Sequence, residues 1–113
     1  MAEVAVAKSR MRKQIKMMVD RIVMRFQPEK IILFGSHARG NAAPDSDVDL
    51  LVVMPVTGSK RQKAVKIGVS LHDIPVAKDV IVVTPEEFEW RKDVIGTIEW
   101  PASREGKVLY ARQ

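Results

Sequence analysis

Residues 31–54 read IILFGSHARGNAAPDSDVDLLVVM, and this segment predicts the central strands of the fold. It opens with a continuous apolar run over residues 31–34, which is typical of a strand covered on both faces, and Gly35 ends that run. Residues 40–46 are rich in turn formers, and residues 47–54 alternate acidic with apolar side chains before becoming wholly apolar. The sequence therefore predicts two strands whose connection is too short for a long crossover helix.

An amphipathic helix is predicted before these strands. Between residues 11 and 26, apolar side chains recur at the three- and four-residue spacing of one helix face, and we expect the helix over residues 10–27. It should end at Gln27, because Pro28 has no amide hydrogen and disfavours helical geometry in the residue before it.

Two further helices and a third strand are expected downstream. Ser59 is the expected N-cap of a helix over residues 60–72, and an apolar strand led by an acid follows at residues 79–83. Thr84 is followed directly by a proline and, three residues later, by a glutamate. This pattern is typical of a strong helix start. That helix is expected to run to residue 94 or 95, with Gly96 as its C-cap.

The tail is expected to hold a short helix interrupted near Pro101 and a brief strand over residues 107–110. This order of elements predicts one small α/β (α+β) domain over residues 1–113, built on a mixed β-sheet flanked by helices. Within it, the N-terminal helix precedes a core over residues 30–96 and a C-terminal helix and short strand over residues 97–112. We expect Trp90 and Trp100 to be packing anchors.

Composition excludes several classes of protein. The chain has 113 residues, 46% of them hydrophobic and 29% charged, which is ordinary globular composition. The longest apolar run, residues 50–56, is far shorter than the roughly 20 residues of a membrane-spanning helix. We expect no membrane association, no secretory leader and a cytoplasmic location. The absence of cysteine excludes disulfides, cysteine-ligated zinc and thiol catalysis.

The positive charge is concentrated at the start of the chain. Residues 1–30 hold eight basic and three acidic residues, which equals the net charge of +5 of the whole chain. Such a segment could steer the protein toward nucleic acid or an acidic partner, or it could simply be a solvated helix face. Aromatic side chains do not interleave with the charges, so we do not expect nucleic-acid binding.

Three acidic residues are candidate metal ligands. Asp47 and Asp49 lie two apart on the predicted strand, so their side chains leave the same face about 6.6–6.8 Å apart. Paired carboxylates beside an apolar sheet repel each other, and a divalent cation removes that repulsion. Asp79 would join them if the third strand neighbours the second. Carboxylate oxygens suit magnesium or manganese.

A candidate phosphate-binding turn follows the first strand. Gly35 lets a phosphate approach the backbone, and the hydroxyl and amide groups of Ser36 can donate hydrogen bonds to it. Arg39 adds a cation that can bind phosphate through two hydrogen bonds. Phosphate donors on one strand and metal-binding acids on the next indicate a metal-chelated nucleotide.

The arrangement resembles the nucleotidyltransferase superfamily that includes DNA polymerase beta. The matching features are Gly35-Ser36 after an apolar strand, Asp47-Val48-Asp49 after ten further residues, and Asp79 on a later strand. The runs GSHARG, DSDVDL and REGKVLY look most like the minimal nucleotidyltransferases, which are commonly encoded beside a HEPN-domain toxin. His37 departs from the pattern, because many of these small proteins carry arginine there.

The resemblance implies transfer of a nucleoside monophosphate from a triphosphate to a hydroxyl, with release of pyrophosphate. Asp47, Asp49 and Asp79 would be catalytic and would bind two Mg²⁺ ions, with Mn²⁺ as a substitute. The residues implied to bind the nucleotide are Gly35, Ser36, Arg39 and Ser46. The first hypothesis is an antitoxin of a type II/VII-like toxin–antitoxin pair that moves AMP from Mg-ATP to a hydroxyl, such as that of a tyrosine, on a partner HEPN toxin.

Other functions stay open at this point. The protein could be a non-catalytic antitoxin that neutralises its toxin by binding, although such a protein has no need of clustered acids. It could also be an aminoglycoside-type nucleotidyltransferase of small molecules, acting as a homodimer. Nucleic-acid binding through residues 8–30 is a weaker alternative. The sequence does not decide the role of His37, the nucleotide preference or the oligomeric state.

Overall fold

The fold is a four-stranded mixed sheet with helices on both faces and at one end. The computed structural model describes residues 2–43 and 45–113. The order in the sheet is β3-β2-β1-β4, with β1 antiparallel to both of its neighbours and β2 parallel to β3. The elements are α1 (Ala2–Phe26), β1 (Lys30–Phe34), α2 (Ser36–Arg39), β2 (Val48–Val53), α3 (Lys60–Ser70), β3 (Lys78–Val83), α4 (Pro85–Arg91), α5 (Glu99–Glu105) and β4 (Lys107–Ala111). The predicted α+β class and the order of elements are confirmed.

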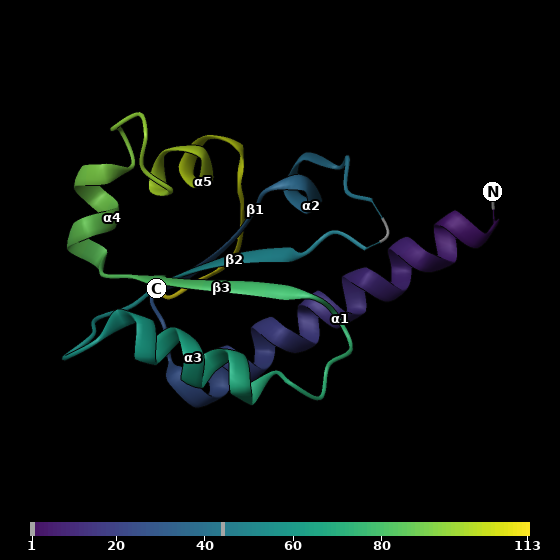
Figure 1. Ribbon diagram of the computed structural model, residues 1–113, viewed down its shortest axis with the longest axis horizontal. Helices are drawn as coiled ribbons and strands as arrows, with labels where there is room; N and C mark the ends of the chain where they lie inside the picture. Colours follow the sequence, from purple (N-terminus) through teal and green to yellow (C-terminus); the bar gives the residue numbers. More distant parts are fainter. Residues whose placement is uncertain (1, 44) are drawn as a thin grey trace.

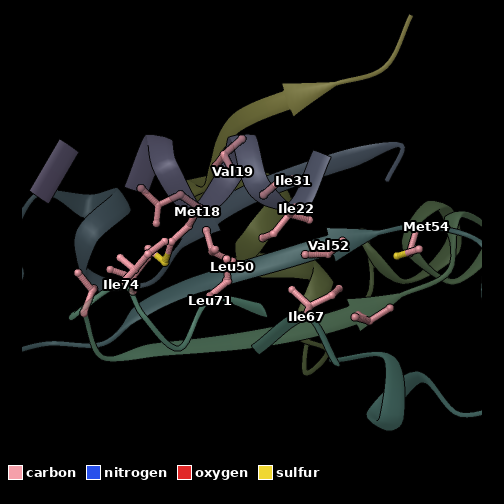
Figure 2. Packing of buried hydrophobic residues seen from close by; sticks show 14 of the residues in the cluster. Met18, Val19, Ile22, Ile31, Leu50, Val52, Met54, Ile67, Leu71 and Ile74 are labelled. Carbon is pink, nitrogen blue, oxygen red and sulfur yellow. The ribbon is translucent and has the colours of Figure 1, made fainter. Parts of the chain in front are cut away.

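Two apolar layers hold the sheet between its helices. Helices α1 and α3 cover one face, and α4 and α5 cover the other (Figure 1). Figure 2 shows the first layer, where Met18 and Ile22 of α1 pack toward Leu50 on β2 and toward α3. Because side chains alternate along a strand, Leu51 belongs to the second layer, together with Phe88 of α4. The prediction of strands covered on both faces is confirmed.

Helix α1 is longer than its periodicity predicts. It begins at Ala2, eight residues before the expected start, because the leading residues are mostly good helix formers. It ends at Phe26, one residue before the expected Gln27. Gln27 has left-handed geometry with φ 52°, which turns the chain toward Pro28 and β1. The proline thus terminates the helix as predicted, with the boundary moved by one residue.

The N-terminal caps of α3 and α4 are those that the sequence predicts. The Ser59 hydroxyl accepts a hydrogen bond from the Gln62 amide at 3.1 Å. The Thr84 hydroxyl accepts one from the Glu87 amide at 3.2 Å, and the Glu87 carboxylate accepts one from the Thr84 amide, which completes a capping box. Helix α3 ends at Ser70, two residues before the expected end.

The segment between α4 and α5 differs from expectation. Helix α4 ends at Arg91, before the predicted residue 94 or 95, because the Thr97 hydroxyl lies within hydrogen-bond distance of the Arg91 and Val94 carbonyls and holds the chain in turns. Helix α5 is not interrupted at Pro101, since this proline lies in its first turn, where an amide hydrogen has no helical partner. Trp90 is 60% exposed, so it is not the packing anchor expected, and the Arg91 guanidinium lies 5.0 Å from its ring centroid.

In the part of the chain that the structure describes, no helix combines the length and the apolar character that crossing a membrane requires.

Candidate active site

Two of the predicted acids lie side by side on neighbouring strands. In the parallel pairing of β2 with β3, Asp49 is the register partner of Asp79. Asp47 lies just before β2, which begins at Val48, so the expectation that Asp47 stands within the strand is wrong. Asp79 is the second residue of β3 rather than its first. Because a tight turn precedes β2, the strand begins one residue later than the alternating pattern suggests.

The charges of Asp47 and Asp79 affect the protonation of Asp49. Burial raises the pKa of the Asp49 carboxyl above its ordinary value of 3.8, and the neighbouring charges of Asp79 and Asp47 raise it further. The neighbouring His37 and Arg39 side chains act in the opposite direction and lower the pKa of Asp49. Asp49 is half-buried, whereas Asp47 and Asp79 are exposed. The site is therefore an open, negatively charged end of the sheet with cationic groups beside it.

Gly35 brings the phosphate-binding turn against these acids. β1 and β2 pair so that Phe34 stands opposite Asp49, which places Gly35 at the end of that ladder. Gly35 has φ 75° and ψ −158°, a region that is essentially restricted to glycine. A Cβ atom on Gly35 would lie 2.2 Å from Oδ2 of Asp49. The backbone turn and the carboxylate are thus in direct contact, with no room for a side chain between them.

Helix α2 begins at Ser36 and connects the two sides of the site. The Ala38 and Arg39 amides donate to the Gly35 carbonyl, both at 3.1 Å. Ser36 is partly accessible at the start of this turn. Nη1 of Arg39 lies 3.6 Å from Oε2 of Glu105 in α5, so Arg39 faces the α5 side of the sheet. Glu105 has no signal in the sequence beyond its place in the REGKVLY run.

Ser46 and His37 stabilise the turn that leads to Asp47. The Ser46 hydroxyl accepts a hydrogen bond from the Ala43 amide at 2.9 Å, and the Ser46 amide donates to the Ala43 carbonyl at 3.0 Å. Nε2 of His37 lies 2.9 Å from the Ser46 carbonyl, a distance at which the protonated nitrogen donates. His37 therefore links α2 to the turn. The Ser46 hydroxyl has a structural partner, and its nucleotide contact stays a prediction.

Asp47, Asp49 and Asp79 offer carboxylate oxygens of the kind that bind a divalent cation, although the three side chains are not close enough together to enclose one. Among the residues that the structure describes, no group of three or more histidine, cysteine, aspartate or glutamate side chains is close enough together to hold a metal ion. The mutual effect of Asp47, Asp49 and Asp79 on the Asp49 pKa is the kind of repulsion that a cation relieves. Mg²⁺ needs few protein ligands because it keeps several waters. The chemistry of these residues therefore fits magnesium.

The family of the protein follows from a comparison with sequence models. The model of the nucleotidyltransferase domain matches residues 15–102, which include both the Gly35-Ser36 turn and the three acids. The chain therefore belongs to the nucleotidyltransferase domain family. No curated protein matches the chain.

Solved structures with a similar fold include a candidate nucleotidyltransferase from Sulfolobus solfataricus, with a TM-score of 0.65 and 22% identity over 93% of this chain and 86% of that one. This likeness supports the fold. A toxin–antitoxin structure with AMP-PNP matches with a TM-score of 0.49 and 24% identity over 88% of this chain and 71% of that one. A tri-AMPylated HEPN toxin in complex with an MNT antitoxin, from Shewanella oneidensis, matches with a TM-score of 0.44 and 21% identity over 95% of this chain and 74% of that one.

Proposed function

We propose that this nucleotidyltransferase is the antitoxin of a toxin–antitoxin pair and transfers AMP from Mg-ATP to a hydroxyl, such as that of a tyrosine, on a partner HEPN-domain toxin. Family membership supports the transferase activity in general. The choice of AMP and of a HEPN partner is supported by the GSHARG, DSDVDL and REGKVLY runs, which resemble the minimal nucleotidyltransferases.

The contact between Asp49 and Gly35 carries the proposal. One oxygen of Asp49 lies where a Gly35 side chain would be, and the same residue stands in register with Asp79. Groups that suit a triphosphate and groups that suit its metal ions therefore meet at one point. A domain that only binds a partner has no need to hold like charges together beside a glycine turn, because their repulsion costs stability.

The proposed reaction is an in-line displacement at the α-phosphorus of ATP. The acceptor hydroxyl forms a new P–O bond, the bond between the α-phosphorus and the bridging oxygen breaks, and pyrophosphate leaves with that oxygen. Gly35 and Ser36 would hold the leaving phosphates through backbone and hydroxyl donors, with Arg39 as a further cation. Asp79 would accept the proton of the acceptor hydroxyl. Asp47, Asp49 and Asp79 would hold two metal ions, which when bound would supply charge stabilisation to the attacking and leaving oxygens.

The openness of the site favours an acceptor on another molecule. Asp47 and Asp79 are exposed, and α4 and α5 pack over the sheet around Phe88 and Ala102 rather than over the acids. A hydroxyl on a flexible segment of a partner can therefore reach the carboxylates. This geometry suits a protein acceptor better than a small molecule, which needs an enclosing pocket.

The test is transfer of label from ATP in a lysate of the source organism. The purified protein is incubated with Mg²⁺ and ATP labelled at the α-phosphate, and the protein and small-molecule fractions are both examined. A parallel reaction uses ATP labelled at the γ-phosphate. We expect one labelled protein band with the α-label and none with the γ-label, because the γ-phosphate leaves in pyrophosphate.

Matched variants identify the acids as the cause. The double variant Asp47→Asn/Asp49→Asn should lose the labelled band, whereas Asp45→Asn, an exposed carboxylate in the same turn, should keep it. A labelled small molecule would favour the aminoglycoside-type transferase instead. Labelling that survives in the double variant, or that is absent with every nucleoside triphosphate, would contradict the proposal and favour an antitoxin that acts by binding.

A further inference from the structure

A groove with an apolar floor lies between α1 and the β4 side of the sheet. Its volume is about 860 Å³. Met11, Ile15 and Val19 of α1 form one wall, and Leu33 of β1 and Leu109 of β4 form the other. This is the face of the sheet that α1 and α3 cover, so the groove and the carboxylate of Asp49 lie on opposite faces.

The groove exists because α1 is longer than the sheet that it covers. Figure 1 shows the N-terminal part of α1 extending past the ends of the strands, so the face of that part has no strand beneath it. Met11 and Ile15 are only partly buried as a result. A β-bulge in β4 makes the opposite wall, because Ile31 pairs with Tyr110 and Ile32 with Val108, which leaves Leu109 as the extra residue. Leu109 and Tyr110 therefore both pack on the α1 side.

Basic side chains surround the apolar floor. Lys8, Arg12 and Lys16 recur every four residues along α1, about 6 Å apart along its axis, and Lys107 lies across from them on β4. Of the described residues, Asp20 is the acid that lines the groove, and Lys16 pairs with it at 2.9 Å. Among the described residues, no ion pair forms at Arg12 or Lys107 (the salt bridges lie elsewhere). The groove thus offers an apolar stripe between a row of cations on α1 and Lys107 on β4.

We propose that this groove binds an amphipathic helical segment of a partner protein, with apolar side chains on one face and acidic side chains beside them. A helix that binds in a groove places apolar residues spaced three and four apart against it, and Met11, Ile15 and Val19 line the groove with apolar side chains every four residues along α1. Carboxylates at the edges of that face would meet Arg12 and Lys107. The charge pattern gives the partner its chemistry, and the apolar floor supplies the buried area.

Other occupants fit the groove less well. A second copy of this chain carries a net charge of +5, concentrated in the same helix, so its approach by α1 would be repelled. Nucleic acid would meet the cations but would leave the apolar side chains of Met11, Ile15 and Leu109 uncovered, and among the described residues no phenylalanine, tyrosine or tryptophan lines the groove to stack on a base. Peptide binding, RNA competition and light scattering distinguish these occupants.

The groove opens at the end of the sheet where the active site lies. His37, Gly40, Ala42 and Ala43 line it, and they belong to α2 and to the turn that leads to Asp47. His37 touches the groove and also contacts the Ser46 carbonyl. A docked partner would therefore hold its neighbouring residues close to the carboxylates, although the identification of that partner with the AMP acceptor rests on the proposed function.

Two synthetic helical peptides of about five turns serve as probes. Both carry leucines at positions three and four apart on one face, and the remaining positions hold mainly glutamate in one peptide and mainly lysine in the other. Binding to the full chain is measured by fluorescence polarisation without nucleotide or metal. We expect the acidic peptide to bind at least about tenfold more tightly than the basic one, and its affinity to fall as salt is raised.

Charge-reversed variants locate the binding surface without disturbing the core. Arg12→Glu/Lys107→Glu alters two exposed residues that line the groove, and we expect about tenfold weaker binding of the acidic peptide. Lys13→Glu/Arg61→Glu changes the net charge equally at exposed residues outside the groove, and we expect less than about a twofold effect. Methyl NMR signals of Ile15 and Leu109 should shift when the acidic peptide is added to the wild-type protein.

Several results would overturn the inference. These are equal binding of the two peptides, no binding of the acidic peptide, equal effects of the two double variants, or methyl shifts confined to other residues. A single-stranded RNA that shifts the same methyl signals and competes with the peptide would assign the groove to nucleic acid. A dimer in light scattering that Arg12→Glu/Lys107→Glu dissociates would assign it to a second copy. Because no nucleotide is present, failure of AMP transfer leaves these measurements unaffected.

Discussion

Asp49 and Asp79 stand directly beside each other in the parallel register of β2 and β3, and an Asp49 carboxylate oxygen lies over Gly35. A parallel pair of strands requires a long connection, here α3, which brings two acids that are thirty residues apart in sequence to one edge of the sheet. The candidate active site thus depends on the packing of α3 as well as on the local run DSDVDL.

The first prediction concerns the stability of Asp49→Asn as a function of pH. Because the folded-state pKa of Asp49 is raised above 3.8, its protonated form stabilises the native state, and this contribution is lost as pH rises through the folded pKa. Asparagine keeps that position neutral at every pH. In the absence of divalent ions, the free energy of unfolding of the variant should equal that of the wild type below about pH 4. At pH 7 it should exceed that of the wild type by less than about 1 kcal/mol.

Thermal unfolding of the two proteins across this pH range measures the difference. Addition of Mg²⁺ at pH 7 should raise the Tm of the wild type, because a cation relieves the repulsion among the acids, and should have less effect on Asp49→Asn. Asp45→Asn is the control and should show the same Mg²⁺ response as the wild type. A variant that is less stable than the wild type at pH 7 without metal would show that Asp49 has a stabilising partner.

The second prediction compares the stability cost of alanine substitutions at two glycines, Gly35 and Gly40. Gly35→Ala should cost about 2–4 kcal/mol, because its backbone geometry is restricted to glycine and the new Cβ would displace the Asp49 carboxylate. Gly40→Ala should cost only about 1 kcal/mol, since Gly40 also has a positive φ of 81° but its Cβ would meet nothing within 4 Å. Urea unfolding measures both. Similar costs for the two variants would mean that contact with Asp49 is unimportant.

Local signals in the sequence predicted much of this fold. The capping box at Thr84, the N-cap at Ser59 and the stop at Pro28 each depend on a few adjacent residues, and each is present. The apolar runs of β1 and β2 predicted strands buried on both faces for the same reason. The early end of α4 at Arg91 could not be read this way, because it depends on hydrogen bonds from Thr97.

The candidate site was predictable in its residue types but not in its contacts. The spacing of Gly35, Asp47 and Asp49 indicated a nucleotide and a metal, and Asp79 was expected to join them if the strands were neighbours, which they are. The pairing of Arg39 with Glu105 and the proximity of His37 to Ser46 arise only when distant elements pack together. Sequence periodicity carries no information about such contacts.

The third prediction uses the contact between Arg39 and Glu105. Both side chains are about half exposed and 3.6 Å apart, so the pair should contribute little to stability. If Arg39 binds the triphosphate, Arg39→Gln should raise the KM for ATP about tenfold with a Tm close to that of the wild type. Glu105→Gln removes a competitor for the guanidinium, so the KM should stay the same or fall. An equal rise of KM in both variants would instead indicate that the ion pair positions α2.

The last prediction concerns Glu87, which joins α4 to α3. Its carboxylate lies 2.6 Å from Nζ of Lys60 and 3.2 Å from Nη1 of Arg91, and it also completes the cap at Thr84. The Lys60 hydrogen bond is the main reason that the pKa of Glu87 falls from 4.5 to about 2. A carboxyl whose folded pKa is lowered stabilises the native state above its unfolded pKa, and this contribution is lost as pH falls from about 4.5 toward 2.

Glu87→Gln keeps a hydrogen-bonding side chain at the cap but removes the charge, so it should cost about 1 kcal/mol at pH 7. The difference in unfolding free energy from the wild type should shrink between pH 4.5 and pH 2, as the wild-type carboxylate is protonated. Glu86→Gln, an exposed neighbour in the same turn, should change stability by less than about 0.5 kcal/mol. Chemical unfolding at several pH values measures all three proteins, and a pH-independent cost for Glu87→Gln would show that the lost cap geometry, not the ion pair, dominates.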